Sequence, residues 1–213
     1  QLGCAQNYTQ IDLEQSRVVR RRLQWPDANL LISVNEETTM EILIVYETVE
    51  GQTRKIVEFI EDRMTSAGHA VRRFNTQDKL GSVSFDGIDK VILAAPVHER
   101  RHPKGFEVFV AASRDALKAC PTLFVSVSLK AAFPEGQEDA QDYLAEMKMR
   151  TGFEPDQEVL AAGAVRTSSY GYFESQDVQN VILGDRQLDL IDGVREFTDW
   201  GALGAEIDKF LIS

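Results

Sequence analysis

The chain has 213 residues, of which 23 are lysine or arginine and 34 are aspartate or glutamate, so its formal net charge is −11. This length suits one α/β domain, or one domain with an appendage, and is sufficient to bury a full core. The charge excludes nucleic acid and anionic membrane surfaces as expected partners, and no apolar run approaches the roughly 18 residues of a transmembrane helix.

The cysteines and histidines do not form a metal or disulfide pattern. Cys4 and Cys120 are the two cysteines, and the three histidines are His69, His98 and His102. Because no ligand spacing is present, we expect no metal site. The cysteine usage also predicts a buried, structural Cys120 and a cytoplasmic protein rather than one from an oxidising compartment.

The organisation of the chain changes at Met40. Residues 1–39 lack a regular hydrophobic period and contain a basic cluster at Arg17 and Arg20–Arg22. We interpret them as an N-terminal extension outside the core fold, in which Leu30–Val34 has the composition of a short added strand. Residues 40–213 then form the predicted domain.

From Met40 onward, strand patterns alternate with helix patterns. Residues 41–46 form a nearly continuous apolar run, typical of a strand covered on both faces. Residues 90–95 and 122–127 predict two more buried strands, and the polar alternation of residues 70–74 predicts an edge strand. A fifth strand is expected over residues 159–165.

Helical spacing separates these strands. Four helices are predicted. The first covers residues 52–67 and ends at Gly68, and the second starts near Pro103 and reaches Leu117. The third covers residues 139–149 and the fourth residues 200–211. Between Val165 and Asp199 lies a long stretch without a strong element, and loops of that length are usually functional.

Strands that alternate with helices predict an α/β fold with a doubly wound parallel sheet, because parallel neighbours need crossover connections. In such sheets ligands bind beyond the carboxyl ends of the strands. The loops after Tyr46, Ala95 and Val127 are therefore the predicted site.

The loop from Glu47 to Lys55 has the chemistry of a phosphate site. It carries one glycine, Gly51, and hydroxyls at Thr48 and Thr53, directly before a helix N-terminus. Backbone amides and the helix dipole at such a turn favour an anion. The loop matches neither a Walker A motif nor G-x-G-x-x-G. A monophosphate site and a hydroxyl-capped helix start without a ligand fit the spacing equally well.

The motif Thr48-x-x-Gly51-x-Thr53 after a first strand resembles the FMN phosphate loop of flavodoxins. The sequence Glu50-Gly51-Gln52-Thr53-Arg54 is similar to that of the menaquinone-dependent protoporphyrinogen IX dehydrogenases. This resemblance covers residues 41–211. It includes the stretch Ala162–Arg166, the long insertion that follows, and Thr198-Asp199-Trp200.

The resemblance implies a flavodoxin-like five-stranded parallel sheet with strand order 2-1-3-4-5, a long insertion after the fifth strand, and FMN as the cofactor. It implies a phosphate loop formed by Thr48, Val49, Glu50, Gly51, Gln52 and Thr53. The loop on one side of the flavin ring would be formed by Pro96, Val97, His98, Glu99 and Arg100. The loop on the other side would be formed by Ser126, Val127, Ser128 and Leu129. No catalytic residue is assigned.

Two departures from this family bear on function. The family has an aromatic residue and a glycine where Glu99 and Arg100 stand, and residues 166–198 contain three basic against six acidic residues. The resemblance implies an FMN-dependent enzyme of haem biosynthesis that oxidises a tetrapyrrole precursor and passes electrons to a quinone. Cations for the carboxylates of that substrate would come from Arg100, Arg101, Lys104, Lys130 and Arg166.

Two alternatives stay open. The acidity of the chain favours a flavodoxin-type electron-transfer protein that docks a redox partner. The second alternative is a flavodoxin-fold protein without flavin. It is favoured by Glu50, Glu99 and Arg100, which depart from the family pattern.

Overall fold

The computed structural model describes residues 39–78, 83–166 and 194–213. The N-terminal extension up to residue 38 lies outside the described residues, and so does the strand expected at Leu30–Val34. Residues 167–193 of the insertion also lie outside them. The domain boundary at Met40 therefore stays a prediction.

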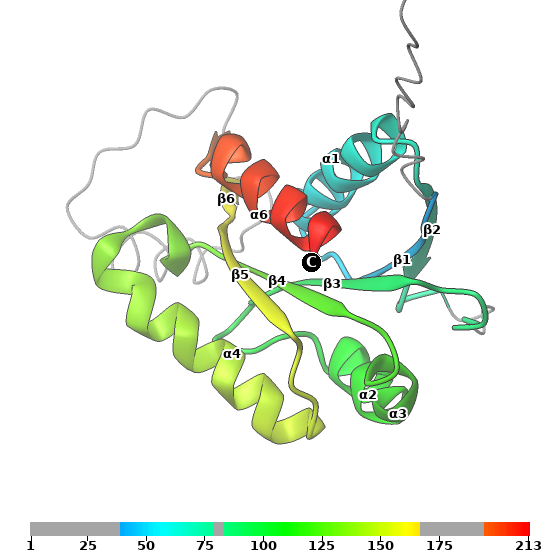
Figure 1. Cartoon of the computed structure of the whole chain (residues 1–213). Coiled ribbons are helices and arrows are strands. Elements are labelled where there is room, and N and C mark those ends of the chain that lie inside the picture. Colours follow the sequence, from blue (N-terminus) through cyan, green and yellow to red (C-terminus); the bar gives the residue numbers. More distant parts are fainter. Residues whose placement is uncertain (1–38, 79–82, 167–193) are drawn as a thin grey trace, which may run out of the picture. The chain divides into compact units, whose positions relative to one another are not determined.

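The domain is built on a five-stranded parallel sheet (Figure 1). Its strands in chain order are β1 (Glu41–Tyr46), β2 (Ala70–Asn75), β3 (Lys90–Pro96), β4 (Thr122–Ser128) and β5 (Gln157–Ala162). They lie in the order β2-β1-β3-β4-β5, and every neighbouring pair is parallel. The predicted doubly wound order 2-1-3-4-5 is confirmed.

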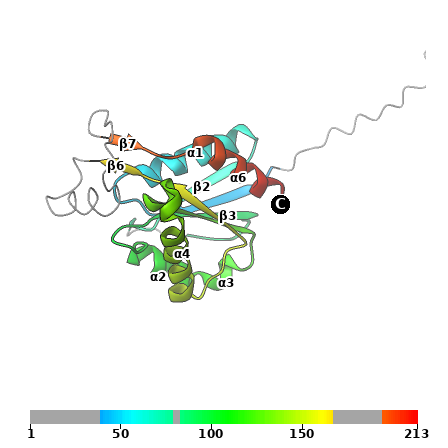
Figure 2. The same cartoon turned by 90° about the vertical axis from the view of Figure 1, so that its left-hand side faces the viewer.

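Helices cover both faces of this sheet (Figures 1 and 2). Helix α1 (Gln52–Ser66) and helix α6 (Trp200–Ile212) pack on one face. Helices α2 (Lys104–Ala112), α3 (Arg114–Leu117) and α4 (Gln137–Thr151) pack on the other. Alternate residues of each central strand enter the two cores: in β1, Ile42 and Ile44 face α1 and α6, whereas Leu43 and Val45 face α2 and α4.

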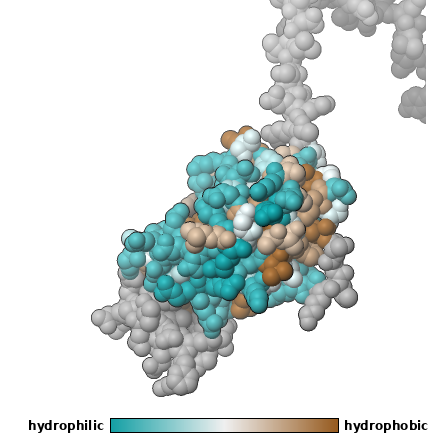
Figure 3. All heavy atoms as spheres, turned by 90° about the horizontal axis from the view of Figure 1, so that it is seen from below, coloured by the Kyte–Doolittle hydropathy of each residue, from teal (hydrophilic) through white to brown (hydrophobic). Residues whose placement is uncertain are grey.

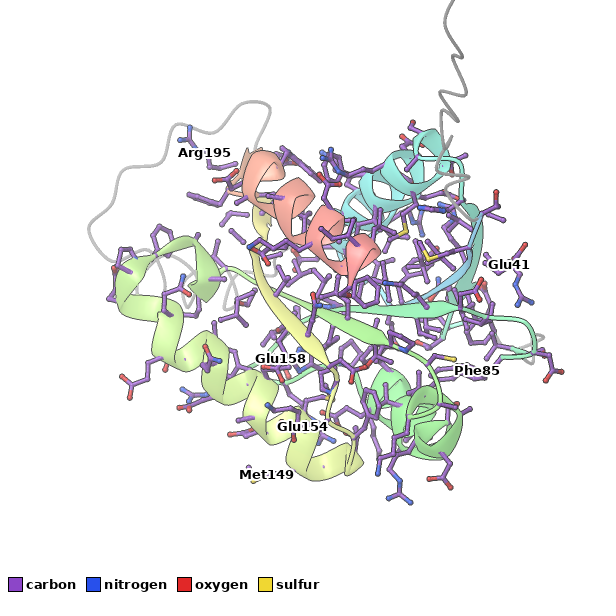
Figure 4. The ribbon with its side chains drawn as sticks, viewed as in Figure 1. Glu41, Phe85, Met149, Glu154, Glu158 and Arg195 are labelled. Carbon is purple, nitrogen blue, oxygen red and sulfur yellow. The ribbon has the colours of Figure 1, made fainter. Side chains whose placement is uncertain are left out.

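The outer face of α2 and α4 is mainly hydrophilic, with scattered apolar residues, as Figure 3 shows from that side. Lys148 of α4 pairs with Glu154 at 3.0 Å and with Glu158 of β5 at 2.7 Å, and Figure 4 labels both acids beside this helix. None of the helices in the described ranges is long and apolar enough to cross a membrane.

The prediction of one continuous fifth strand over residues 159–165 is wrong. Strand β5 ends at Ala162, and β6 (Ala164–Arg166) pairs instead with the antiparallel β7 (Val194–Glu196). Gly163 lies between them: its amide donates to the Ser128 carbonyl at 3.0 Å, and its carbonyl accepts from the Phe197 amide at 3.0 Å. The chain thus pairs with β4 before this glycine and with β7 after it. Strands β6 and β7, which flank the insertion in the sequence, form a two-stranded ribbon.

The other predicted elements are confirmed with shifted ends. The helix expected from Pro103 to Leu117 is interrupted at Ser113, which separates α2 from α3. The one expected over residues 139–149 starts earlier, after two short 3-10 turns, η1 (Lys130–Ala132) and η2 (Pro134–Gly136).

Candidate functional site

The three loops predicted to form the site meet at one end of the sheet. Because β1, β3 and β4 are adjacent, the loops that follow them are neighbours. The Val97 amide donates to the Val127 carbonyl at 2.7 Å, which joins the loops after β3 and β4. His98 Nε2 lies 3.6 Å from Glu50 Oε1, which joins the loop after β3 to the phosphate loop.

The phosphate loop is closed around Gly51, the N-cap residue of α1. Gly51 has a φ of 91°, in the left-handed region that glycine adopts without strain. Its amide donates to Thr48 Oγ1 at 3.2 Å, and both Thr48 and Thr53 are buried. In the described part of the chain the Thr48 hydroxyl accepts this hydrogen bond, and its own hydrogen is free to rotate towards an anion.

The space in front of Gly51 suits a ligand. A Cβ placed on Gly51 would meet no atom within 4 Å. The open space therefore lies at the N-terminus of α1, in a loop that also carries the hydroxyls of Thr48 and Thr53. That donor set fits a phosphate monoester, so the residues present are compatible with the phosphate of FMN.

The Gln52 side chain makes a contact that the sequence did not predict, and the role of its backbone amide in the phosphate loop stays a prediction. Its side chain is buried, and Nε2 donates to Thr198 Oγ1 at 2.9 Å. The Thr198 hydroxyl in turn donates to the Ala162 carbonyl at 2.7 Å. Oε1 of Gln52 is buried without a hydrogen-bond partner in the described part of the chain. Thr198 belongs to the motif Thr198-Asp199-Trp200, but its contact with the phosphate loop could not be expected from the sequence alone, because the two segments are distant in the chain.

Glu196 of β7 strengthens the same connection. Its carboxylate accepts from Lys55 Nζ at 3.1 Å and from Trp200 Nε1 at 2.8 Å. Burial opposes the ionisation of Glu196, but hydrogen bonds from Lys55, Trp200 and Gln52 outweigh it and hold the pKa of Glu196 below its usual range. The Trp200 ring also packs on Phe59 of α1, with ring centroids 5.0 Å apart. The base of the insertion is therefore fixed to the start of α1.

The loop after β3 forms a tight turn. His98 and Arg101 exchange both backbone hydrogen bonds, at 2.9 and 3.0 Å. The two residues between them, Glu99 and Arg100, have φ values of 49° and 63°. Positive φ at both central positions is the pattern of type I′ turns, which favour Asn and Gly. Non-glycine residues in this conformation store strain, of a kind often found at functional sites.

Ser126 faces the interior rather than the surface of the site. Its hydroxyl is fully buried and lies 3.0 Å from His102 Nε2. Burial, and secondarily the charge of Arg150, lowers the pKa of His102 to about 3, so the imidazole is neutral at physiological pH. Nδ1 of His102 is buried and unpartnered within the described ranges. The pair joins β4 to the segment between β3 and α2.

Ser128 and Leu129 shape the loop after β4. Ser128 Oγ accepts from the Ala131 amide at 3.2 Å, which closes the turn that begins η1 at Leu129. Beside this turn, a groove of about 510 Å³ follows β5 towards α6. Its lining includes Ala131, Ala162, Phe197 and Thr198.

Two of the five basic residues expected to receive substrate carboxylates are engaged in ion pairs. Arg101 forms a two-pronged ion pair with Glu107, whose other oxygen accepts from Arg150 at 2.8 Å. Lys130 pairs with Asp139 at 2.6 Å and, through that hydrogen bond, lowers the pKa of Asp139. Both cations are thus already paired with acids of this chain, and their role towards a substrate stays a prediction.

The remaining candidate cations differ in their surroundings. The Arg100 guanidinium lies 5.8 Å from the centre of the Tyr143 ring, and Lys104 is exposed at the start of α2. The side chain of Arg166 lies outside what the structure describes. Within the described residues there is also no cluster of three potential metal ligands, so no metal site is visible there.

Comparisons with known proteins agree with this geometry. The family model described as "Flavodoxin domain" matches residues 43–186, more than half of the chain and all three loops of the site. The protoporphyrinogen IX dehydrogenase [quinone] of Escherichia coli K12 is 26% identical over 136 residues, which are 63% of this chain and 75% of that protein.

Solved structures with a similar fold include two flavodoxins. A short-chain flavodoxin associated with a PDU bacterial microcompartment is 14% identical, with a TM-score of 0.45, over 59% of this chain and 85% of its own. A Fusobacterium nucleatum flavodoxin bound to flavin mononucleotide is 15% identical, with a TM-score of 0.44, over 82% of this chain and 96% of its own. The strand order and the family match, rather than these scores, establish the fold.

Proposed function

The chain belongs to the Flavodoxin domain family, and from that premise we propose that it is an FMN-binding oxidoreductase. The observation that carries this proposal is the loop before α1: a left-handed Gly51 borders open space at the N-terminus of α1, and the same loop carries the hydroxyls of Thr48 and Thr53. A bound flavin would supply hydride and single-electron chemistry that amino-acid side chains lack.

In this proposal the chain holds and surrounds the cofactor. Thr48, Thr53 and the amides of residues 49–53 hold the phosphate by charge-assisted hydrogen bonds. The turn after β3, with His98, Glu99 and Arg100, borders the flavin ring on one side. The backbone from Val127 to Leu129 borders it on the other. Ser126 contributes through its hydrogen bond to His102 and not through contact with the flavin.

We propose more specifically that the protein oxidises a tetrapyrrole precursor in haem biosynthesis, passes electrons to a quinone, and works in the cytoplasm. Support comes from the E. coli relative, whose name states both substrate and acceptor. The Gln52–Thr198 contact adds to it, because it fixes the base of the insertion beside the phosphate loop. A bulky substrate would then lie between the flavin and the insertion.

A second candidate function is that of an electron carrier that docks a redox protein. The observation in its favour is that Arg101 and Lys130 are already paired with Glu107 and Asp139. Two cations that a doubly anionic tetrapyrrole would need are thereby neutralised. With a net charge of −11, the chain is suited to a basic protein partner instead.

One experiment addresses both levels of the proposal. The purified protein is reconstituted with FMN, and flavin absorbance is measured after removal of free ligand. Protoporphyrinogen and a menaquinone analogue are then added anaerobically while flavin bleaching is followed. Stoichiometric flavin with bleaching supports the enzyme. Flavin that only a reductase can bleach supports the carrier, and no bound flavin would refute both.

A further inference from the structure

The turn after β3 is connected to two helices by the side chains of two consecutive residues. Arg101 donates to Glu107 Oε2 on α2, through Nε at 3.1 Å and through a second guanidinium nitrogen. The Arg100 guanidinium lies 5.8 Å from the centre of the Tyr143 ring, and Tyr143 is buried on α4. The second half of the turn is therefore connected to α2 and to α4.

The position of the Glu107 carboxylate is itself fixed. Its side chain is 5% exposed, whereas that of Arg101 is 48% exposed. The second carboxylate oxygen of Glu107 accepts from Arg150 Nε on α4 at 2.8 Å, and Arg150 also donates to Glu146 at 2.8 Å. Because both oxygens are used by planar guanidinium groups, the carboxylate has a defined orientation. Arg101 is thus joined to a buried, immobilised acid.

The backbone of this turn has a conformation that its own residues disfavour. Glu99 and Arg100 have φ values of 49° and 63°, although neither is a glycine or an asparagine. Such residues are costly in the left-handed region and persist there when the surrounding structure holds them. The pair Asn-Gly adopts the same backbone with little strain. The natural turn therefore depends on contacts with the elements around it more than an Asn-Gly turn would.

We infer that Glu107 is a positioning residue of the flavin site, which holds the turn after β3 in its strained conformation through Arg101. This inference rests on the proposed function, in which the turn borders the flavin ring. FMN and riboflavin have the same ring. Loss of the Arg101–Glu107 ion pair should consequently weaken the binding of both flavins by a similar factor, because the phosphate loop is not changed.

The test is a mutant cycle that combines the ion pair with the turn. Arg101→Gln breaks the pair from its half-exposed end, where the fold tolerates the change, and Glu107→Gln breaks it from the buried end. Each is made in the natural turn and in a turn with Glu99→Asn and Arg100→Gly. Glu158→Gln is the matched control, because it removes an ion pair between α4 and β5.

Two quantities are measured for each protein. Quenching of flavin fluorescence gives the dissociation constants of FMN and riboflavin. Amide hydrogen exchange in the flavin-free protein gives the opening of the turn, since the amides of residues 98 and 101 donate to the carbonyls of residues 101 and 98. In the natural turn, Arg101→Gln should weaken both flavins about three- to tenfold and speed both exchange rates by a similar factor.

The Asn-Gly turn separates positioning from a general contribution to packing. In that background, Arg101→Gln and Glu107→Gln should change affinity and exchange by less than about twofold, and Glu158→Gln should leave both quantities unchanged in either turn. Equal losses in the two turns, no loss in the natural turn, or a loss for FMN alone would overturn the inference. A wild type that binds no flavin would instead refute the proposed function, and the exchange rates would still decide whether Glu107 holds the turn.

Discussion

The amide of Gln52 donates a 2.9 Å hydrogen bond to the hydroxyl of Thr198, a residue 146 positions later in the chain. This contact ties the first residue of α1 to the residue before the N-cap Asp199 of α6, and through Thr198 to the last carbonyl of β5. The phosphate loop and the base of the insertion are thereby one polar unit. Changes at the base of the insertion should therefore affect the stability of the loop.

Removal of this contact should destabilise the fold. Thr198→Val leaves the buried Gln52 amide and the Ala162 carbonyl without their partner, and each such loss costs about 1–3 kcal/mol. Urea denaturation at pH 7 measures the free energy of unfolding. Gln137→Leu is the control, because Gln137 makes an exposed hydrogen bond to the Ala131 carbonyl. An equal loss of unfolding free energy in the two variants would show that the Gln52–Thr198 hydrogen bond contributes no more to stability than an exposed hydrogen bond.

Gly51→Val should abolish FMN binding while the protein still folds. The cost has two parts: a β-branched residue is strained at a φ of 91°, and its side chain would occupy the space proposed for the phosphate. Gly68 offers a matched control at the other end of α1, since its φ is 88° and a Cβ there also meets no atom within 4 Å. Gly68→Val should lose stability and keep FMN. Loss of FMN in both variants would point to unfolding rather than to the loop.

Thr53→Val should weaken FMN binding by about 1.5–3 kcal/mol, the range for a hydrogen bond to a charged group. Riboflavin binding should change little, because it has no phosphate for this hydroxyl. Isothermal titration with both ligands gives the comparison. Thr65→Val is the control at the far end of α1, where the hydroxyl donates to the Glu61 carbonyl at 2.7 Å. Unchanged FMN affinity in Thr53→Val would place the phosphate elsewhere.

The sequence predicted local features better than contacts between distant residues. The apolar run of β1 and the glycine before α1 are visible in short windows, so the central sheet and the position of Gly51 at the start of α1 were predicted correctly, while the binding of a phosphate there stays a prediction. The direction of the Gln52 side chain could not be predicted, because its partner Thr198 is distant in the chain. The break at Gly163 was hidden in an otherwise continuous apolar run.

Charge pairing was the other feature that the sequence did not reveal. Arg101 and Lys130 read as free cations near the site, yet Glu107 and Asp139 neutralise them from the first turns of α2 and α4. Such pairs depend on how helices pack over the end of the sheet. The assignment of cations to a substrate is therefore the part of the prediction that the structure changes most.

Stability should fall as the pH drops from 7 to 5, in part through His102. Its folded-state pKa is about 3 and its ordinary value 6.5, so between these values the unfolded chain binds a proton that the folded chain does not. The contribution of His102 is thus complete above pH 6.5 and is lost progressively below it, on the order of 2 kcal/mol by pH 5.

The double variant His102→Phe with Ser126→Ala tests this slope. It removes the titrating group and the hydroxyl that would lose its partner. Urea midpoints for the variant should vary less between pH 7 and pH 5 than those of the wild type. If the double variant keeps the wild-type pH dependence of the urea midpoint, His102 is not the group that causes it.

The insertion can be removed without disturbing its base. Cα atoms of Arg166 and Val194 are directly opposed in the antiparallel β6–β7 pair, so the two-residue turn Asn-Gly can replace residues 167–193. The contacts of Glu196 and Thr198 with α1 lie outside the replaced segment. We expect the shortened protein to fold and to retain FMN with nearly wild-type affinity.

This variant separates the two candidate functions. If the insertion forms the substrate surface, anaerobic bleaching by protoporphyrinogen is lost while reduction by a generic flavodoxin reductase persists. If the protein is an electron carrier, the wild type shows no such bleaching, and one-electron exchange with the reductase proceeds at similar rates in both proteins. Bleaching that survives the replacement would place the tetrapyrrole against the turn after β3, where Arg100 and Lys104 lie. Loss of FMN from the shortened protein would show instead that the insertion contributes to the cofactor site.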